Sequence, residues 1–233
     1  MQKLLASLVA GAALALFSSA GQACDFHDMQ TTSTQAEPVV AIDGSGNSLV
    51  FGSRTIDPSA SVPSYAMTAG YRAAGAATWQ VQGLDTSGGP ALASAAFDTS
   101  GNAFVVWRPN LSGGNSIVYG TRRSAGAWET PTALSDVMAV DTRFPRVSVD
   151  GRALLLFEQK FSSADPFKVY SRLWKQGLWS DISAVQNDAN EGRFADCPRN
   201  ANLSDNFEIA WRETDPADAT QFRVMSSFVQ LGP

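Results

Sequence analysis

At three equivalent positions of an internal repeat, an aromatic residue ends a short apolar segment and stands directly before a charged residue. The pairs are Trp107–Arg108, Phe157–Glu158 and Trp211–Arg212. An aromatic ring can stack on the apolar face of a sugar while a neighbouring charged group hydrogen-bonds the hydroxyls. Packing between strands is the alternative role for the same rings. The candidate ligand contacts are Trp107, Arg108, Trp174, Trp211 and Arg212, where Trp174 is included because it has no aromatic counterpart in the pattern.

Residues suited to acid–base or nucleophilic catalysis form no recognisable constellation. His27 is the single histidine, so any Ser-His-Asp triad would have to use it, and its place beside Asp28 suits a surface residue. Several glutamates have aspartates nearby, but their spacing singles out no acid–base pair. They are Glu129, Glu158, Glu191, Glu208 and Glu213. The sequence therefore assigns no catalytic residue and no cofactor, and it leaves enzymatic activity open.

Two short segments imitate the start of a calcium-binding loop. They are Asp43-x-Ser45-x-Asn47 and Asp98-x-Ser100-x-Asn102, and neither is followed by the glutamate that completes an EF-hand site. A hairpin turn is the alternative, in which Gly46 and Gly101 take positive φ and the aspartate caps the turn. We predict turns rather than metal sites.

These turns belong to an internal repeat with a period of about 50 residues. The phrase from Asp98 to Trp107 is a polar turn followed by an apolar strand, and related phrases begin at Asp43, Asp150 and Ser204. Each unit continues with a polar loop of variable length and a third strand. In three units a glycine turn and a tryptophan then open a fourth strand, at Trp79, Trp128 and Trp179. This order predicts an all-β protein, a β-propeller of four blades with four antiparallel strands each.

The two ends of the chain are expected to share the last blade. The final unit stops at Pro233 without a fourth strand, whereas residues 25–34 precede the first complete unit. Pairing of that N-terminal segment with residues 222–228 would close the ring and remove exposed strand edges. Cys24 and Cys197 would then lie in the same blade, where a disulfide is expected for an exported protein. The predicted domain spans residues 24–233, with repeats at about 35–88, 89–141, 142–194 and 195–233 plus 24–34.

The N-terminus predicts export. A positive start is followed by an apolar stretch from Leu4 to Phe17 and by small residues that permit cleavage after Ala20 or Ala23, so residues 1–23 are expected to be a signal peptide. The mature protein would be periplasmic or secreted. Lipidation of Cys24 is the alternative, and it excludes the disulfide. A net charge of −5 argues against a nucleic-acid partner, and no second apolar segment is long enough to cross a bilayer.

The Asp98–Trp107 phrase, followed by Arg122 and by Gly126-x-Trp128, resembles the BNR, or sialidase-like, propeller repeats of secreted bacterial proteins. The resemblance covers nearly the whole mature chain. True Asp-boxes, Ser-x-Asp-x-Gly-x-Thr-Trp, are absent, because Arg72–Trp79 keeps the Thr-Trp end and lacks the aspartate. A sialidase would also imply an arginine triad, a tyrosine–glutamate pair and an acid–base aspartate, none of which a local motif assigns here.

The sequence thus predicts an exported, non-catalytic binding or interaction module, with carbohydrate as the first candidate ligand and a cell-surface protein as another partner. Two alternatives stay open: a degenerate sialidase-like glycoside hydrolase, and a structural cell-surface protein anchored by a lipid on Cys24. The sequence indicates no oligomeric state.

Overall fold

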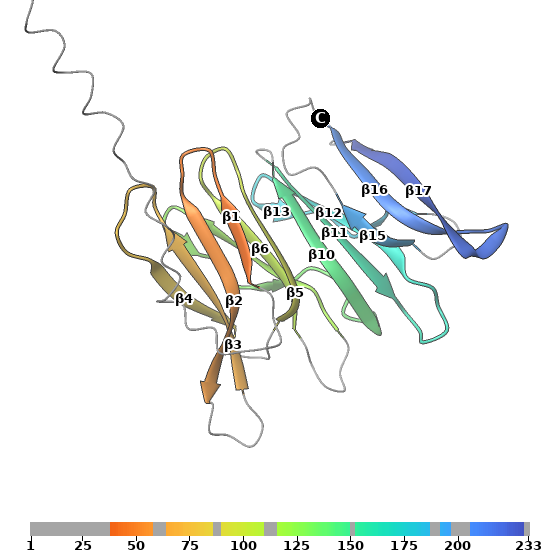
Figure 1. The fold of residues 1–233 in the computed structure, drawn as a ribbon, viewed down its shortest axis with the longest axis horizontal. Helices are drawn as coiled ribbons and strands as arrows, with labels where there is room; N and C mark the ends of the chain where they lie inside the picture. The colour runs from red at the N-terminus through yellow and green to blue at the C-terminus, as the bar shows by residue number, and fades with distance from the viewer. Residues whose placement is uncertain are drawn as a thin grey trace, which may run out of the picture. The chain divides into compact units, whose positions relative to one another are not determined.

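The computed structural model describes residues 38–57, 64–85, 90–109, 116–149, 152–186, 192–196 and 206–230. Every regular element in these ranges is a β-strand, which confirms the all-β prediction (Figure 1). None of the described residues forms a helix that could span a membrane. The predicted signal peptide, the N-terminal closing segment and the Cys24–Cys197 pair lie outside the described residues.

The strands form four antiparallel sheets that follow the sequence repeats (Figure 1). Sheet A contains β1 (Val39–Ile42), β2 (Ser48–Asp57), β3 (Ser64–Arg72) and β4 (Gln80–Asp85). Sheet B contains β5 (Pro90–Phe97), β6 (Ala103–Pro109), β7 (Tyr119–Ser124), β8 (Ala127–Trp128) and β9 (Thr132–Ala133). Sheet C contains β10 (Asp141–Val149), β11 (Ala153–Lys160), β12 (Lys168–Lys175), β13 (Leu178–Trp179) and β14 (Ser183–Ala184). Sheet D contains β15 (Gly192–Asp196), β16 (Asn206–Asp215) and β17 (Asp218–Gln230).

In sheets B and C the predicted fourth strand is split into two short strands that both pair with the third. In sheet B the split contains Pro131, which has no N–H to donate to the ladder. In sheet C the Ser180 side chain takes over a backbone position, because its Oγ accepts a hydrogen bond from the Leu173 N–H at 3.0 Å. The repeat period therefore predicts where the fourth strand begins, whereas Pro131 and Ser180 interrupt its hydrogen-bond ladder.

The repeated aspartate phrase forms the same hydrogen-bonded turn in sheets A and B. Asp98 Oδ1 accepts from the N–H groups of Ser100 and Asn102, at 2.9 and 2.8 Å, and Asp98 Oδ2 accepts from Asn102 Nδ2 at 2.7 Å. Asp43 makes the equivalent three bonds to Ser45 and Asn47. Both central glycines have positive φ, +86° at Gly46 and +77° at Gly101, which confirms the predicted hairpin turns.

The described core lies between sheets that follow one another along the chain. One apolar cluster joins sheets A and B around Phe51 and Trp107, and a second joins sheets B and C around Phe104 and Phe157. A third joins sheets C and D around Phe207. Alternation along each strand produces this arrangement: Leu155 and Phe157 of β11 belong to the second cluster, whereas Leu154 and Leu156 belong to the third.

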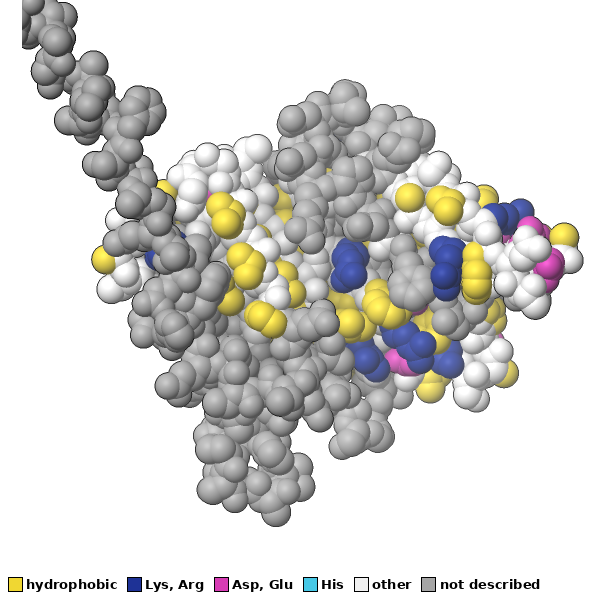
Figure 2. Space-filling view, in the orientation of Figure 1, with side chains coloured by type: hydrophobic (Ala, Val, Ile, Leu, Met, Phe, Trp, Pro, Cys, Tyr) yellow, Lys and Arg dark blue, Asp and Glu magenta, His cyan; other side chains and the backbone are white. Residues whose placement is uncertain are grey.

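Sheets A and D also expose apolar side chains. Val40 and Ile42 of β1 are exposed, and Figure 2 shows hydrophobic side chains at the surface over β1 and β2. Phe222 and Val224 of β17 are exposed on the face of sheet D opposite to Trp211, because the register pairs Trp211 with Met225 and alternates from there. Each of these sheets therefore carries an apolar face in addition to the one packed in the described core.

Candidate functional site

The structure places Trp107 and Trp211, two of the predicted ligand contacts, in the core. Trp107 is 0% exposed; its ring lies 5.5 Å from Phe51 of sheet A and stacks on Tyr119 of β7 at 6.2 Å. Trp211 is buried in the cluster between sheets C and D, and its Nε1 donates to Glu213 Oε2 at 3.4 Å. Neither indole is available at the surface to stack on a ligand, so both have the packing role that the sequence left as the alternative.

The other three predicted contacts are partly exposed and lie on three different sheets. Arg108 of β6 donates from Nη2 to Ser116 Oγ at 2.8 Å and to Asp141 Oδ1 at 3.2 Å. The Arg212 guanidinium lies 3.8 Å from the centre of the Phe222 ring. Trp174 packs edge-on against Phe104, and the Arg122 guanidinium lies 4.4 Å from its ring. None of the three lines the pocket described next.

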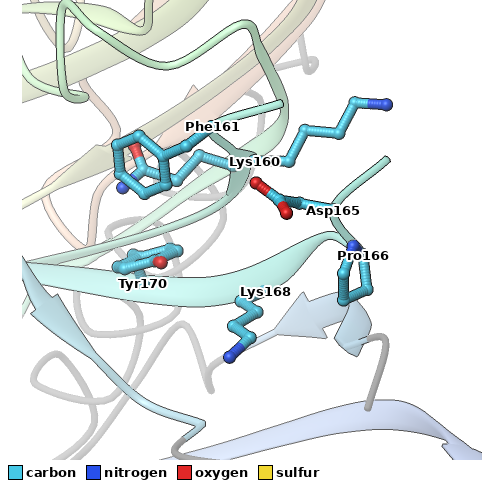
Figure 3. Close-up of a pocket in the computed structure, with 7 residues that line it drawn as sticks. Lys160, Phe161, Asp165, Pro166, Lys168 and Tyr170 are labelled. Atoms are coloured by element: carbon cyan, nitrogen blue, oxygen red, sulfur yellow. The ribbon is translucent and has the colours of Figure 1, made fainter. Parts of the chain in front are cut away.

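A pocket of about 330 Å³ opens where β11 ends and β12 begins (Figure 3). One hairpin supplies all of its lining residues: Gln159, Lys160, Phe161, Asp165, Pro166, Lys168 and Tyr170. The β11–β12 loop is the variable polar loop of its repeat, and it carries the aromatic and acidic groups to the mouth of the pocket. We refer to this site as the hairpin pocket.

Two aromatic rings form one wall of the hairpin pocket. Phe161 and Tyr170 meet edge to face, with ring centres 6.3 Å apart and planes at 82°. Tyr170 also stacks on Phe157 at 6.1 Å, and Phe157 is fully buried, so the tyrosine ring rests on the core. Phe161 is 44% exposed. The wall therefore combines a fixed ring with one that presents its surface to solvent.

Polar groups face the same space. Figure 3 shows the Asp165 carboxylate directed toward the region between Phe161 and Tyr170. A local turn holds this residue, because the Asp165 N–H donates to both Oγ and the backbone oxygen of Ser162, at 3.2 and 3.3 Å. Gln159 is buried, and its Oε1 accepts from the Asp136 N–H at 3.3 Å. A carboxylate, an amide and a phenol are thus available to a polar ligand.

The phenol of Tyr170 is in an environment that disfavours its ionised form. Burial is the largest cause and raises its pKa above the ordinary value, while a hydrogen bond with Gln159 acts in the opposite direction. The negative charges of Asp136 and Asp165 raise the pKa further. At neutral pH, Tyr170 is therefore a neutral hydroxyl that can both donate and accept a hydrogen bond.

A charged cluster lies beside the pocket. Asp141 bridges two arginines, Arg108 at 3.2 Å and Arg143 at 2.8 Å, and it pairs with Lys160 in the ladder between β10 and β11. The register of β10 shifts between Arg143 and Arg146, where Pro145 cannot donate to the ladder. Arg108 therefore reaches the strand end at which the hairpin pocket opens, although it does not line it.

Two of the glutamates considered as acid–base candidates lie in the protein interior. Glu158 of β11 and Glu213 of β16 are both buried, and Glu213 forms an ion pair with Arg223. Gln186 Nε2 lies 3.5 Å from Glu213 Oε2. Neither glutamate lines the hairpin pocket, where Asp165 is the one carboxylate among the lining residues. The described residues contain no cluster of three or more His, Cys, Asp or Glu side chains suited to a metal ion.

The aromatic contacts predicted from the sequence lie at the ends of second strands, where Trp107 and Trp211 are buried. Phe161, which was not among the predicted contacts, follows Lys160 and is exposed at the pocket. Tyr170 shares its repeat position with Tyr119, which stacks on the buried Trp107, so the sequence pattern alone favours a packing role for both. A signal was available, because Phe161 is an aromatic residue in an otherwise polar loop segment that also contains Asp165.

No protein-family model matches the chain, and no curated protein sequence matches it. Among solved structures, it is similar to an alpha-L-arabinanase from Penicillium chrysogenum solved with arabinobiose, at 7% identity over 85% of this chain and 63% of that one, with a TM-score of 0.49. It is also similar to a neuraminidase-like protein from A/bat/Guatemala/164/2009, at 7% identity over 82% of this chain and 54% of that one, with a TM-score of 0.45. A fucose lectin from Kordia zhangzhouensis, solved with methyl-fucoside, is 13% identical over 65% of this chain and 100% of the lectin, with a TM-score of 0.39. The chain spans less than two thirds of the length of the arabinanase and the neuraminidase-like protein.

Proposed function

We propose that this protein is an exported, non-catalytic carbohydrate-binding module that holds its ligand in the hairpin pocket. The observation that carries the proposal is the combination of an exposed aromatic ring, Phe161, with the Asp165 carboxylate and the Tyr170 hydroxyl around a space of about 330 Å³. Pockets of this size fall at the lower end of the range for small-molecule sites. A single sugar ring or the end of an oligosaccharide is a suitable occupant.

The chemistry of the lining fits a sugar. The C–H face of a pyranose is apolar and can lie on Phe161, while Asp165, Gln159 and Tyr170 exchange hydrogen bonds with hydroxyls. Hydrogen bonds to a charged group contribute more than neutral ones and fix orientation. A longer ligand would continue from the pocket toward Arg108 and the Asp141 cluster, which keeps Arg108 as a contact of an extended chain. Trp174 and Arg212 remain candidate contacts only for ligands that reach sheets C and D elsewhere.

Glycan-array screening followed by calorimetry tests the proposal. Phe161→Ala should weaken binding of the selected glycan at least tenfold, which corresponds to a loss of about 1.4 kcal/mol. Leu178→Ala is the control, because Leu178 is also an exposed apolar residue, 76% against 44% for Phe161, and it does not line the pocket. Equal loss in both variants, or unchanged binding by Phe161→Ala, would contradict the assignment of the pocket.

A glycoside hydrolase is the runner-up, and the pocket favours it less. Glycosidases usually place two carboxyl groups on either side of the scissile bond, roughly 5 to 9.5 Å apart. Asp165 is the one carboxylate among the described lining residues, and Glu158 and Glu213 are buried elsewhere. Turnover of a fluorogenic sialoside, abolished by Asp165→Asn, would establish the enzyme and overturn the non-catalytic proposal.

We further propose that the four sheets are blades of a BNR-like, sialidase-like propeller closed by residues 24–34. Two observations support closure. In sheets A, B and C the third strand also pairs with a later strand, whereas sheet D has only three described strands. Sheets A and D also each carry a second, exposed apolar face. Packing those faces on each other would bury Val40, Ile42, Phe222 and Val224. Non-reducing peptide mapping should find Cys24 linked to Cys197.

Export is part of the same proposal, with residues 1–23 as the signal peptide and residues 24–233 as the mature domain in the periplasm or outside the cell. N-terminal sequencing of the mature protein should give a start after Ala20 or Ala23. A diacylglyceryl group on Cys24 would instead indicate the lipid-anchored alternative, and it would exclude the disulfide.

A further inference from the structure

We propose that the ligand held in the hairpin pocket carries a protonated amine, as in an oligosaccharide of glucosamine units whose 2-amino groups are free. The amine would lie between the Asp165 carboxylate and the faces of Phe161 and Tyr170. This inference rests on the proposed carbohydrate-binding function and narrows its ligand to an amine-bearing sugar.

The arrangement of the two rings suits a cation. Phe161 and Tyr170 are nearly perpendicular, at 82°, so the face of one ring and the edge of the other meet at the pocket wall. The face of an aromatic ring carries negative electrostatic potential and attracts an ammonium group within about 6 Å of its centre. Tyr170 is fixed by its stacking on the buried Phe157, which keeps this surface in place.

The nearest acidic groups increase that negative potential. Within the described part of the chain, the Asp165 carboxylate has no hydrogen-bond or ion-pair partner, and Figure 3 shows it directed toward the rings. Asp136 lies close enough to act on the Tyr170 phenol as well, since both carboxylates raise the pKa of that phenol. An ammonium group placed there would donate a charge-assisted hydrogen bond to Asp165.

The two lysines of the lining direct their charges elsewhere. Figure 3 shows the ammonium groups of Lys160 and Lys168 pointing away from the space between Phe161 and Tyr170. The Lys160 ammonium lies 4.9 Å from the centre of the Phe167 ring, which the Arg143 guanidinium also approaches at 4.1 Å. Two of the positive charges near this hairpin, Lys160 and Arg143, therefore lie at Phe167, while the Asp165 carboxylate faces the pocket.

Calorimetry on the full-length mature protein with four probes tests the inference. The probes are a glucosamine tetramer with free amines, its fully N-acetylated counterpart, a glucose tetramer of the same linkage, and choline as an ammonium without a sugar. The free-amine tetramer should bind at least tenfold more tightly than either of the other tetramers, and its advantage should shrink as salt is raised because charge attraction is screened.

Three variants identify the groups responsible. Asp165→Asn should reduce the preference for the free-amine tetramer to less than about threefold while leaving weak binding of the glucose tetramer, as expected from loss of one charge-assisted hydrogen bond. Asp181→Asn, an exposed acidic residue outside the pocket, should change nothing. Lys168→Gln removes a positive charge from the pocket lining and should therefore strengthen binding of the free-amine tetramer.

The outcomes separate the inference from the function on which it rests. Equal binding of the three tetramers, or weaker amine binding by Lys168→Gln, would overturn the amine assignment while the carbohydrate site stands. Binding of choline alone, lost in Asp165→Asn, would support the cation site and contradict the carbohydrate function. Binding of none of the four probes would overturn both.

Discussion

Asp98 shows how much of the stability of a sheet depends on one side chain. Its carboxylate is buried and receives three hydrogen bonds from within its own turn, two from backbone N–H groups and one from Asn102 Nδ2. Each donor would be left without this partner if the carboxylate were removed, and Asn102 is itself only partly exposed. The aspartate recurs in the repeat because the turn requires an acceptor at this position.

We therefore expect Asp98→Ala to lower the free energy of unfolding by about 1–3 kcal/mol, the cost of leaving buried donors unsatisfied. Urea denaturation followed by tryptophan fluorescence measures the change. Ser100→Ala is the control, since its side chain is exposed and the N–H that bonds Asp98 is retained. A similar loss in both variants would mean that the turn sequence in general, and not the carboxylate, is responsible.

Tyr170 makes the stability of the protein sensitive to alkaline pH. Its pKa is raised in the folded state, chiefly by burial, relative to an unfolded value of about 10. The folded state holds the proton more tightly, so this contribution is fully present below pH 10 and is lost as the pH rises through the folded pKa. Above pH 10, the free energy of unfolding of the wild type should therefore fall relative to that of Tyr170→Phe. A constant difference from pH 8 to pH 11 would contradict this.

The roles of individual aromatic residues could be predicted only in part, because burial depends on the neighbouring sheet. Trp107 lies within β6 and Phe161 directly follows β11, yet Trp107 is covered by Phe51 from sheet A whereas Phe161 extends beyond the covered end of β11. The residues next to Trp107 in the sequence do not indicate that the Phe51 ring lies 5.5 Å from its own. The hairpin turns were predictable for the opposite reason, since the three hydrogen bonds to the Asp98 carboxylate all come from residues within four positions of it.

The close approach of β7 to its neighbours is visible at Gly120. A Cβ at this position would clash with the side chain of Leu134 and lie 3.2 Å from Val106 Cγ1. Leu134 is buried, and its N–H donates to the Val118 backbone oxygen at 2.7 Å, so it has little room to move. The glycine is thus required by packing between strands and not by its backbone angle.

Gly120→Ala should lower the free energy of unfolding by about 1–3 kcal/mol through overpacking. Gly83→Ala in β4 is the matched control, because a Cβ there has no neighbour within 4 Å. Chemical denaturation of both variants would measure the difference. Equal stabilities would show that the Leu134 side chain can move aside.

The fourth strands show where periodicity stops being informative. Sequence spacing located Trp128 and Trp179 correctly at the start of these strands, in β8 and β13. The breaks that follow arise from a proline and from a serine side chain that substitutes for the ladder, and a period of about 50 residues contains no information on either.

The molecule as a whole is built from sheets that each pack on the next in sequence. The repeat period predicted the four sheets and their strand order, since each strand pair is local in the chain. Ring closure is different, because it requires contact between residues 24–34 and residues 222–228, which are nearly 200 positions apart in sequence. Residues 24–34 lie outside the described residues. The exposed apolar faces of sheets A and D make this proposal testable.

Val224, which is 81% exposed among the described residues, provides the test. If closure buries it, Val224→Ser should lower the free energy of unfolding by about 1.5 kcal/mol or more, the cost of losing a buried aliphatic side chain. Leu178→Ser is the control, since Leu178 is 76% exposed in the short strand β13 of sheet C, and surface substitutions usually change stability by less than about 0.5 kcal/mol. Effects of equal size would contradict a closed ring.

The twin aspartate turns also bear on how the protein ages in storage. Asn47 is held on both sides, since its Nδ2 lies 2.6 Å from Asp43 Oδ2 and its Oδ1 accepts from the Ala74 N–H at 2.9 Å. Spontaneous deamidation would convert this amide into a second carboxylate facing Asp43, and two like charges at that distance repel. A Cβ on Gly101 would lie 3.5 Å from the same Asn47 and Asp43 groups, so the turn of sheet B lies directly against this pair. One hydrolysed amide would therefore loosen sheets A and B at once.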